Sequence, residues 1–351
     1  MVTIGADLHK RSHTVVAVDE HGRKLAERTV RATPAGHLQL LRWARRRFVV
    51  RIWALEDCRN LSRRLEQDLL TTGETVVRVP PKLMVEARRG GRERGKSDPI
   101  DALATARAAL REPDLPSATL DGPERDLRLL VDHREDLVAT RTRIEGRLRW
   151  HLHELTPGDE PPPRSLDRRH VLDGLEAQLA DVPGNVARIA REQLSWIREL
   201  TASIDALERE ISGLVRALAP TLLALEGCGA LTAAKLVGET AGAGRFRSRA
   251  AFARHNGTAP IPVWSGNDTR HRLSRGGNRQ INAALHRIAV TQLRRGGRGR
   301  DYLEKRMAAG DTKTEAIRAL RRRLSDEVFR RMLDDESRLA TLPIPSPALA
   351  A

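Results

Sequence analysis

The chain has 351 residues, with 62 Lys or Arg against 46 Asp or Glu, so its net charge near neutral pH is +16. This length accommodates two or three domains, and the excess of positive charge favours a polyanionic partner, which we expect to be nucleic acid. Two cysteines exclude a disulfide framework and a cysteine-rich zinc site, and 3% aromatic residues are too few for the base-stacking sheets of RNA-recognition domains.

The sequence contains no apolar run of the length that spans a membrane, and its first residues lack the apolar core of a signal peptide. We therefore expect a cytoplasmic protein without a membrane partner.

The first eighty residues show the order of an α/β sheet. Apolar runs predict three antiparallel strands within residues 2–30, and a fourth strand ends at Glu56. A helix that ends before Gly73 and a fifth strand over residues 74–80 follow. Three antiparallel strands followed by strand, helix and strand are compatible with an RNase H-like sheet.

The next segment is a basic loop over residues 82–96, followed by a helix with Ser97 as its predicted N-cap. Gly90, Gly95, Lys96 and Ser97 satisfy the phosphate-binding pattern G-x-x-x-x-G-K-[ST]. A P-loop must follow a buried strand directly, however, and the preceding strand stops about ten residues earlier. We therefore interpret Lys96 as a contact for a nucleic-acid backbone rather than for ATP.

Residues 116–220 are predicted to form a helical middle region. Two helices flank a proline-rich break, and Arg134 and Arg141 interrupt the apolar seam of the first helix. The second helix has the spacing of a coiled coil, within one chain or between chains, so we expect a homo-oligomer, either a dimer or a tetramer. Its apolar positions are Ile197, Leu200, Ile204, Leu207, Ile211, Leu214 and Leu218.

From residue 221 to about residue 335 the pattern changes to short helices. Residues 222–240 resemble a helix–hairpin–helix element, whose Gly-rich turn offers backbone N–H groups to a DNA phosphate. Residues 245–300 contain 13 Arg and a single acidic residue, Asp268. Residues 336–351 are predicted to be a disordered tail.

Four acidic residues stand where their side chains could meet. Asp7 and Glu56 each end an apolar strand, and Asp98 and Asp101 share a helix face at the spacing i, i+3. Carboxylates from two strands and one helix could bind two Mg²⁺ ions about 3.5–4 Å apart, next to the attacking and leaving oxygens of a phosphodiester. Taken singly, each acid is also compatible with an ordinary strand end or first helical turn. The nearby His9 is not expected to bind zinc.

Several segments resemble one family. The stretches "GADLHKRSHTVVAVDEHG", "WALEDC" and "GKSDPIDALATARAAL" are similar to the amino-terminal DEDD domain of the IS110 insertion-sequence transposases. Residues 225–282 resemble the second conserved domain of that family. The resemblance implies α/β plus α architecture, with a RuvC-like catalytic domain over residues 1–115 that binds Mg²⁺, a helical linker over 116–220 and a mostly helical transposase domain over 221–335. The implied catalytic metal ligands are Asp7, Glu56, Asp98 and Asp101.

The resemblance also implies a serine nucleophile. Ser265, which follows "GTAP" closely and precedes Gly266, occupies the family's nucleophile position, although Trp264 before it departs from the commonest pattern. Such a serine attacks a DNA phosphodiester, and the family implies donor and target DNA as substrates and an element-encoded bridge RNA as guide. We expect nucleic-acid contacts from Arg270, Arg272, Arg275 and Arg279, besides Lys96.

Other interpretations stay open at this point. Ser274 is the rival serine, but it is the predicted N-cap of the following helix, and Tyr302 lies in a predicted solvated helix. The chain could also be a RuvC-type junction nuclease in which metal-activated water attacks and Ser265 is structural. A third alternative is a DNA-bridging protein with a degenerate acidic site.

Overall fold

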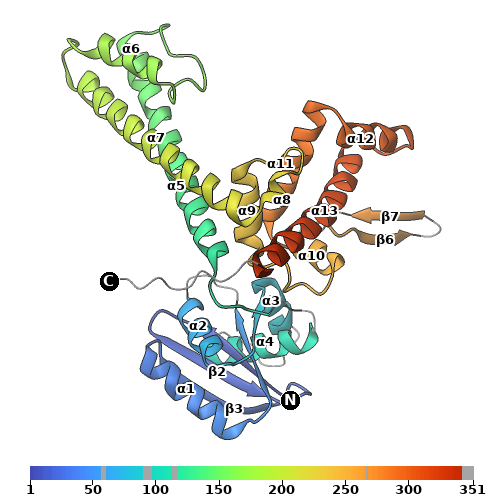
Figure 1. Cartoon of the computed structure of the whole chain (residues 1–351). Coiled ribbons are helices and arrows are strands. Elements are labelled where there is room, and N and C mark those ends of the chain that lie inside the picture. The colour runs from blue at the N-terminus through green and yellow to red at the C-terminus, as the bar shows by residue number, and fades with distance from the viewer. Residues whose placement is uncertain are drawn as a thin grey trace. The chain divides into compact units, whose positions relative to one another are not determined.

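The chain is described by a computed structural model (Figure 1). It forms two compact units, which we call the amino-terminal unit (1–122, 244–255 and 274–277) and the carboxyl-terminal unit (123–243, 256–273 and 278–351). The structure describes residues 1–56, 61–89, 97–112, 115, 117–265, 268–272, 274 and 276–341, with the backbone alone at 82, 88, 89, 264, 265 and 268–270.

The amino-terminal unit is built on a mixed sheet with the strand order β3-β2-β1-β4-β5. β2 pairs antiparallel with both β1 and β3, whereas β4 pairs parallel with β1 and with β5. The predicted α/β order, with three antiparallel strands before strand, helix and strand, is confirmed. The strands are β1 (Val2–Leu8), β2 (Ser12–Val18), β3 (Lys24–Arg31), β4 (Arg51–Glu56) and β5 (Val76–Val79).

The two faces of this sheet carry different helices, because successive side chains of a strand point to opposite faces. Ile4, Ala6 and Leu8 of β1 pack in the core with α1 (Pro34–Arg47) and α2 (Arg63–Thr71). The other face packs against helices of small residues, with Ala102, Leu103 and Ala106 of α4 (Asp98–Arg111) on β2, and Met84 and Ala87 of α3 (Pro81–Arg89) near β4 and β5. The acidic residues therefore belong to the face that α4 covers.

Two of these helices differ from the sequence prediction. α1 was not expected, although Thr33 accepts a hydrogen bond from the Gly36 backbone N–H (3.2 Å) and Pro34 is the first helical residue, which together form an ordinary helix start. The predicted basic loop begins as α3, which continues to Arg89, since its apolar residues pack on the sheet. The rest of that loop, including Lys96, lies outside the described residues.

Helix α4 approaches β1 so closely that only glycine fits at position 5. A Cβ atom on Gly5 would lie 2.2 Å from the Ala102 carbonyl oxygen and 2.4 Å from the Ala106 backbone nitrogen. This close contact fixes the first turn of α4 near the carboxyl end of β1.

We expect Gly5→Ala to destabilise the amino-terminal unit by roughly 3 kcal/mol, because the added methyl group must displace helix backbone rather than a side-chain tip. Urea denaturation followed by circular dichroism measures this loss. Gly213→Ala is the matched control, since a Cβ atom there meets nothing within 4 Å and its helix, α7 (Asn185–Leu218), gains helix propensity. Equal midpoints for Gly5→Ala and the wild type would contradict the contact.

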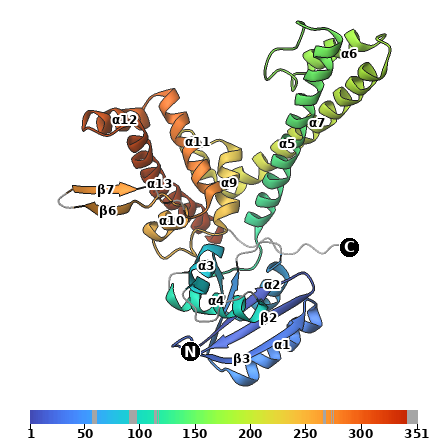
Figure 2. The ribbon, with the colours of Figure 1, turned by 180° about the vertical axis from the view of Figure 1, so that it is seen from behind.

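The carboxyl-terminal unit contains the predicted helical hairpin. α5 (Pro123–Leu155) and α7 (Asn185–Leu218) run side by side and are joined through α6 (Arg169–Leu179), as both views show (Figures 1 and 2). Arg134 donates to Glu208 (3.0 Å) and Arg141 to Thr201 (3.0 Å), so the two seam arginines pair across the hairpin. In α7 one row of the predicted repeat is buried, namely Ile197, Ile204 and Ile211. Self-association through a coiled coil stays a prediction.

The remaining elements are short helices, one hairpin and a long final helix. These are α8 (Pro220–Leu223), α9 (Ala230–Thr240), α10 (Arg249–His255), β6 (Ile261–Ser265), β7 (Asp268–Arg272), α11 (Arg279–Arg295), α12 (Arg298–Ala308) and α13 (Lys313–Thr341). Because α13 continues to Thr341, the first residues of the predicted tail are helical, and residues 342–351 lie outside the described chain. Among the described helices, none combines the length and the apolarity that crossing a bilayer requires. The finer domain boundaries stay predictions.

Candidate active site

The carboxyl ends of β1 and β4 carry the first two acidic residues. These strands are parallel, and their register pairs Gly5 with Ala54 and Ala6 with Leu55. Asp7 and Glu56 are the next residues in that register, on the sheet face that α4 covers. Asp7 is buried, whereas Glu56 is partly exposed.

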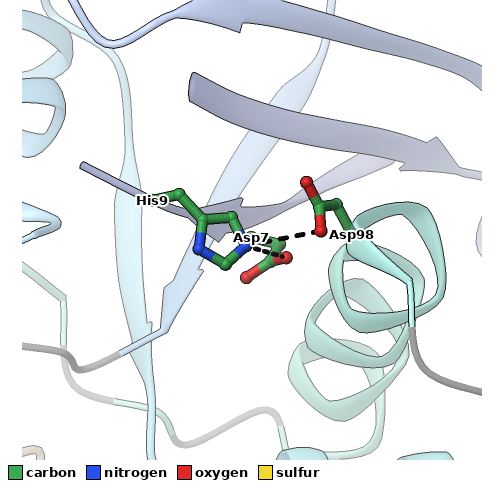
Figure 3. A group of neighbouring side chains, drawn as sticks. All are labelled: Asp7, His9 and Asp98. Carbon is green, nitrogen blue, oxygen red and sulfur yellow. Dashed lines mark hydrogen bonds and ion pairs between the residues drawn. The ribbon is translucent and has the colours of Figure 1, made fainter. Parts of the chain in front are cut away.

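The first turn of α4 brings the third acidic residue to the same place. His9 Nε2 lies 3.1 Å from Asp7 Oδ2 and 3.4 Å from Asp98 Oδ1, so its imidazole bridges the two carboxylates (Figure 3). One donor atom from each of the three residues lies within 4.8 Å of the others. Ser97 occupies the N-cap position of α4 as predicted, but its side chain makes no capping hydrogen bond.

The fourth acidic residue, Asp101, acts on Asp7 through its charge. Burial raises the pKa of Asp7, and the negative charges of Asp101 and Asp98 raise it further, while His9 opposes the shift. A buried carboxylate beside two more carboxylates is a site where a cation is electrostatically favoured. The structure thus brings Asp7, Asp98 and Asp101 together, with Glu56 next to Asp7 in register, and it adds His9, which was not predicted.

The predicted serine lies in the other unit. Ser265 is the last residue of β6, and its backbone pairs with Asp268 at the start of β7. The hairpin extends away from the helices of its unit in both views (Figures 1 and 2). Its connecting residues, Gly266 and Asn267, are outside the described chain.

The basic residues predicted to contact nucleic acid lie in different elements, and some lie outside the described residues. Arg272 is exposed in β7, and Arg279 is exposed as the first residue of α11. Of Arg270 only the backbone, in β7, is described, and Arg275 and Lys96 are outside the described residues.

The prediction that Ser274 caps the following helix is wrong. α11 begins at Arg279, and the Asn278 side chain accepts from the backbone N–H groups of Gln280 (2.9 Å) and Ile281 (3.1 Å). The Asn278 amide also donates to Glu239 (2.7 Å), which holds the cap against α9. Ser274 is too far from the helix start to satisfy its first N–H groups.

A groove of about 730 Å³ lies where the helix–hairpin–helix element was predicted. Gly227 has a φ of +82°, and a Cβ atom there would lie 3.0 Å from the Ile288 carbonyl oxygen, so glycine lets the loop lie directly on α11. The Gln292 side chain donates to the Glu226 backbone carbonyl (2.8 Å) and holds that loop. Burial raises the pKa of the Cys228 thiol in this loop to about 12, so it is an inert thiol.

The wall of this groove is basic. Three exposed arginines of α11 line it, and none has an ion pair among the described residues, although Glu226 lines it too. The N-cap of α9, Gly229, also lines the groove and has no side chain to cap the backbone N–H groups of the first turn. The arginines are Arg287, Arg294 and Arg295.

Two family models match separate stretches of the chain. A family model described as a transposase, of the DEDD type of IS110, matches residues 4–157, and a model described as "Transposase IS116/IS110/IS902 family" matches residues 219–304. These matches place the chain among the transposases.

Individual relatives are insertion-element proteins. The uncharacterized 44.8 kDa protein of insertion element IS116 from Streptomyces clavuligerus is 28% identical over 95% of both chains. The uncharacterized 43.6 kDa protein of IS110 from Streptomyces coelicolor is 26% identical over 68% of this chain and 71% of that protein. T. thermophilus RuvC, solved with a Holliday junction substrate, is similar over 34% of this chain and 99% of its own, with a TM-score of 0.27 and 18% identity. The chain belongs to the IS110 family of insertion-sequence transposases.

Proposed function

We propose that this transposase cleaves and rejoins DNA strands, with Asp7, Glu56, Asp98 and Asp101 as the ligands of divalent cations. The observation that carries the proposal is the meeting of two strand-end acids, in register on one face of the sheet, with the acidic first turn of α4. A purely structural network of ion pairs would not place Asp98 and Asp101 beside the buried Asp7 carboxylate, because neighbouring negative charges repel one another.

The donor set fits a divalent cation. Carboxylate oxygens are the ligands that Mg²⁺ prefers, and burial of Asp7 gives one of them a fixed position. When bound, such ions supply Lewis-acid stabilisation of charge on the reacting phosphate. The chain's own residues fix the ligands: Gly5 allows α4 to contact β1, and the parallel pairing of β1 and β4 sets Glu56 beside Asp7.

We further propose that Ser265 is the nucleophile. Its hydroxyl oxygen attacks phosphorus and forms a phosphoserine bond, the P–O bond to one deoxyribose breaks, and the serine proton balances the charge on the leaving oxygen. Rejoining reverses these steps with a new deoxyribose hydroxyl. The position of Ser265 at the end of a two-stranded hairpin, and the family resemblance of its segment, support this role.

The same resemblance implies a role for each region of the chain. We propose that residues 1–115 form the metal-dependent catalytic domain and that residues 116–220 are a helical linker to the transposase domain. We further propose that a bridge RNA guides the choice of donor and target DNA. Pairing with a second copy of the chain would use the other row of the α7 repeat, Leu200, Leu207 and Leu214, which is only partly buried.

We propose that the basic groove beside α9 binds a nucleic-acid backbone. Backbone N–H groups at a helix N-terminus and unpaired arginines are both donors for phosphate oxygens. We expect the double change Arg287→Ala and Arg294→Ala to weaken DNA binding about tenfold at moderate salt and to reduce the salt slope by about 2, because two phosphate contacts are lost.

Fluorescence anisotropy over a series of salt concentrations measures both quantities. Arg330→Ala is the control, since it removes an exposed charge of the same unit that already pairs with Glu327 and Asp334. A salt slope identical to that of the wild type would remove the groove from the nucleic-acid interface.

The proposed function as a whole is tested with the full chain, donor and target DNA, and RNA transcribed from the non-coding flanks of the gene. Strand exchange that depends on a divalent cation and passes through a covalent protein–DNA adduct supports it. Metal-dependent nicking without an adduct favours the junction nuclease, and DNA binding without cleavage favours the bridging protein.

A further inference from the structure

His9 has a fixed position at the end of β1. Its backbone N–H donates to the Ser12 carbonyl oxygen (3.0 Å), which closes the tight connection between β1 and β2. As residue i+2 from Asp7, it projects to the same face of the strand, where its half-exposed ring reaches over both carboxylates (Figure 3). The main chain therefore places His9 at the mouth of the acidic cluster, and its imidazole contacts the Asp7 and Asp98 carboxylates there.

Two of the three donor separations in this cluster match those of neighbouring ligands around one ion, and the third is at most 4.8 Å. Metal–ligand bonds of about 2.1 Å separate neighbouring donors by about 3.0 Å in an octahedron and about 3.4 Å in a tetrahedron. His9 Nε2 is 3.1 Å from the Asp7 oxygen and 3.4 Å from the Asp98 oxygen. A histidine that only positioned one carboxylate would need a single short contact, whereas this nitrogen faces two carboxylates from different elements.

We propose that His9 supplies a nitrogen ligand to the ion held by Asp7 and Asp98, and that this site therefore prefers a transition-metal dication such as Mn²⁺ over Mg²⁺. The inference rests on the proposed function in that it takes the acidic cluster to be a metal site. Mg²⁺ binds to oxygen donors, whereas imidazole nitrogen adds affinity for first-row transition metals. Among the described residues, this cluster is the one group of three His, Cys, Asp or Glu side chains with such spacing.

The test uses the full chain loaded with Mn²⁺ alone and pulsed EPR, which detects the hyperfine coupling of a bound ¹⁴N nucleus. We expect ¹⁴N coupling in the wild type and its loss in His9→Asn, whose amide can offer only oxygen. His21→Asn is the matched control, because His21 is an exposed histidine of the same unit whose acidic neighbour is Glu20, at 3.7 Å. The ratio of Mn²⁺ to Mg²⁺ affinity, from calorimetry, should fall about tenfold in His9→Asn and hold in His21→Asn.

The outcomes separate this inference from the proposed function. If Mn²⁺ binds to the wild type, is lost in Asp7→Asn and shows no ¹⁴N coupling, His9 is not a ligand while the metal site stands. If the ratio of Mn²⁺ to Mg²⁺ affinity is unchanged in His9→Asn, His9 does not set a preference for Mn²⁺, while the metal site again stands. If the wild type binds no more Mn²⁺ than a folded Asp7→Asn protein does, both the inference and the metal-dependent function fall.

Discussion

Asp7→Asn is expected to reduce DNA cleavage by at least about a thousandfold, equivalent to about 4 kcal/mol of transition-state stabilisation. Asp7 is the buried member of the acidic set, and its carboxylate contacts His9 while Asp98 and Asp101 lie close enough to act on its charge. Asparagine keeps the shape of the side chain but removes the negative charge that, in the proposed function, would hold a cation. The unfolding free energy should hold or rise, because one of three crowded negative charges disappears.

A nicking assay with Mg²⁺ or Mn²⁺, run beside a urea titration, separates activity from stability. Glu20→Gln is the control, since it neutralises an exposed acid of the same unit in the turn after β2. Asp101→Asn should behave like Asp7→Asn, as the charge of Asp101 acts at the same place. Wild-type cleavage by a folded Asp7→Asn protein would remove the acidic set from the chemistry.

The strand ends that carry Asp7 and Glu56 were predictable because they depend on local sequence patterns. Each strand is visible in the sequence as an apolar run. Where two such runs each end in an acidic residue, the two acidic residues lie next to each other if the strands are parallel neighbours. β1 and β4 are such neighbours, and this pairing places Glu56 next to Asp7. The contact that brings α4 to them was not predictable, because nothing near Gly5 in the sequence indicates Ala102 or Ala106.

His9 was missed although the sequence contained its signal. His9 and His13 are four residues apart, a spacing at which the side chains of a strand need not converge, so this pair does not indicate a zinc site. The informative spacing was to Asp7, because residues i and i+2 of a strand share a face. His13 instead lies on the opposite face, buried and stacked on His37 of α1 at 5.2 Å between ring centres. Period-two alternation, applied to the polar residues as well as to the apolar ones, would have separated the two histidines.

Helix α1 was not predicted for a different reason. Its last turn is Arg45, Arg46 and Arg47, and this basic run masks the apolar residues Leu40, Leu41 and Ala44 that enter the core. Capping signals were the better guide there, as Thr33 and Pro34 show. At α11 the residue that caps the helix is Asn278, which directly precedes it, and not Ser274.

Ser265→Ala is expected to eliminate the covalent protein–DNA adduct and strand exchange, while DNA affinity stays within about twofold of the wild type. A single hydroxyl contributes little to binding when arginines and backbone donors contact the phosphates. It is indispensable to a reaction in which its oxygen forms the bond to phosphorus. Register fixes the serine backbone at the end of β6, opposite Asp268, next to the connecting residues of the hairpin.

Ser274→Ala is the matched control, because its hydroxyl contacts the Gly276 carbonyl oxygen at a long 3.5 Å and does not cap α11. Mass spectrometry of a complex trapped on a suicide substrate should find the nucleotide on the peptide that contains Ser265. An adduct on Ser274 or Tyr302 would refute the assignment. The two variants together also separate the chemistries: Asp7→Asn should block nicking and adduct alike, whereas Ser265→Ala would leave metal-dependent nicking intact only if water, and not the serine, attacks the phosphate.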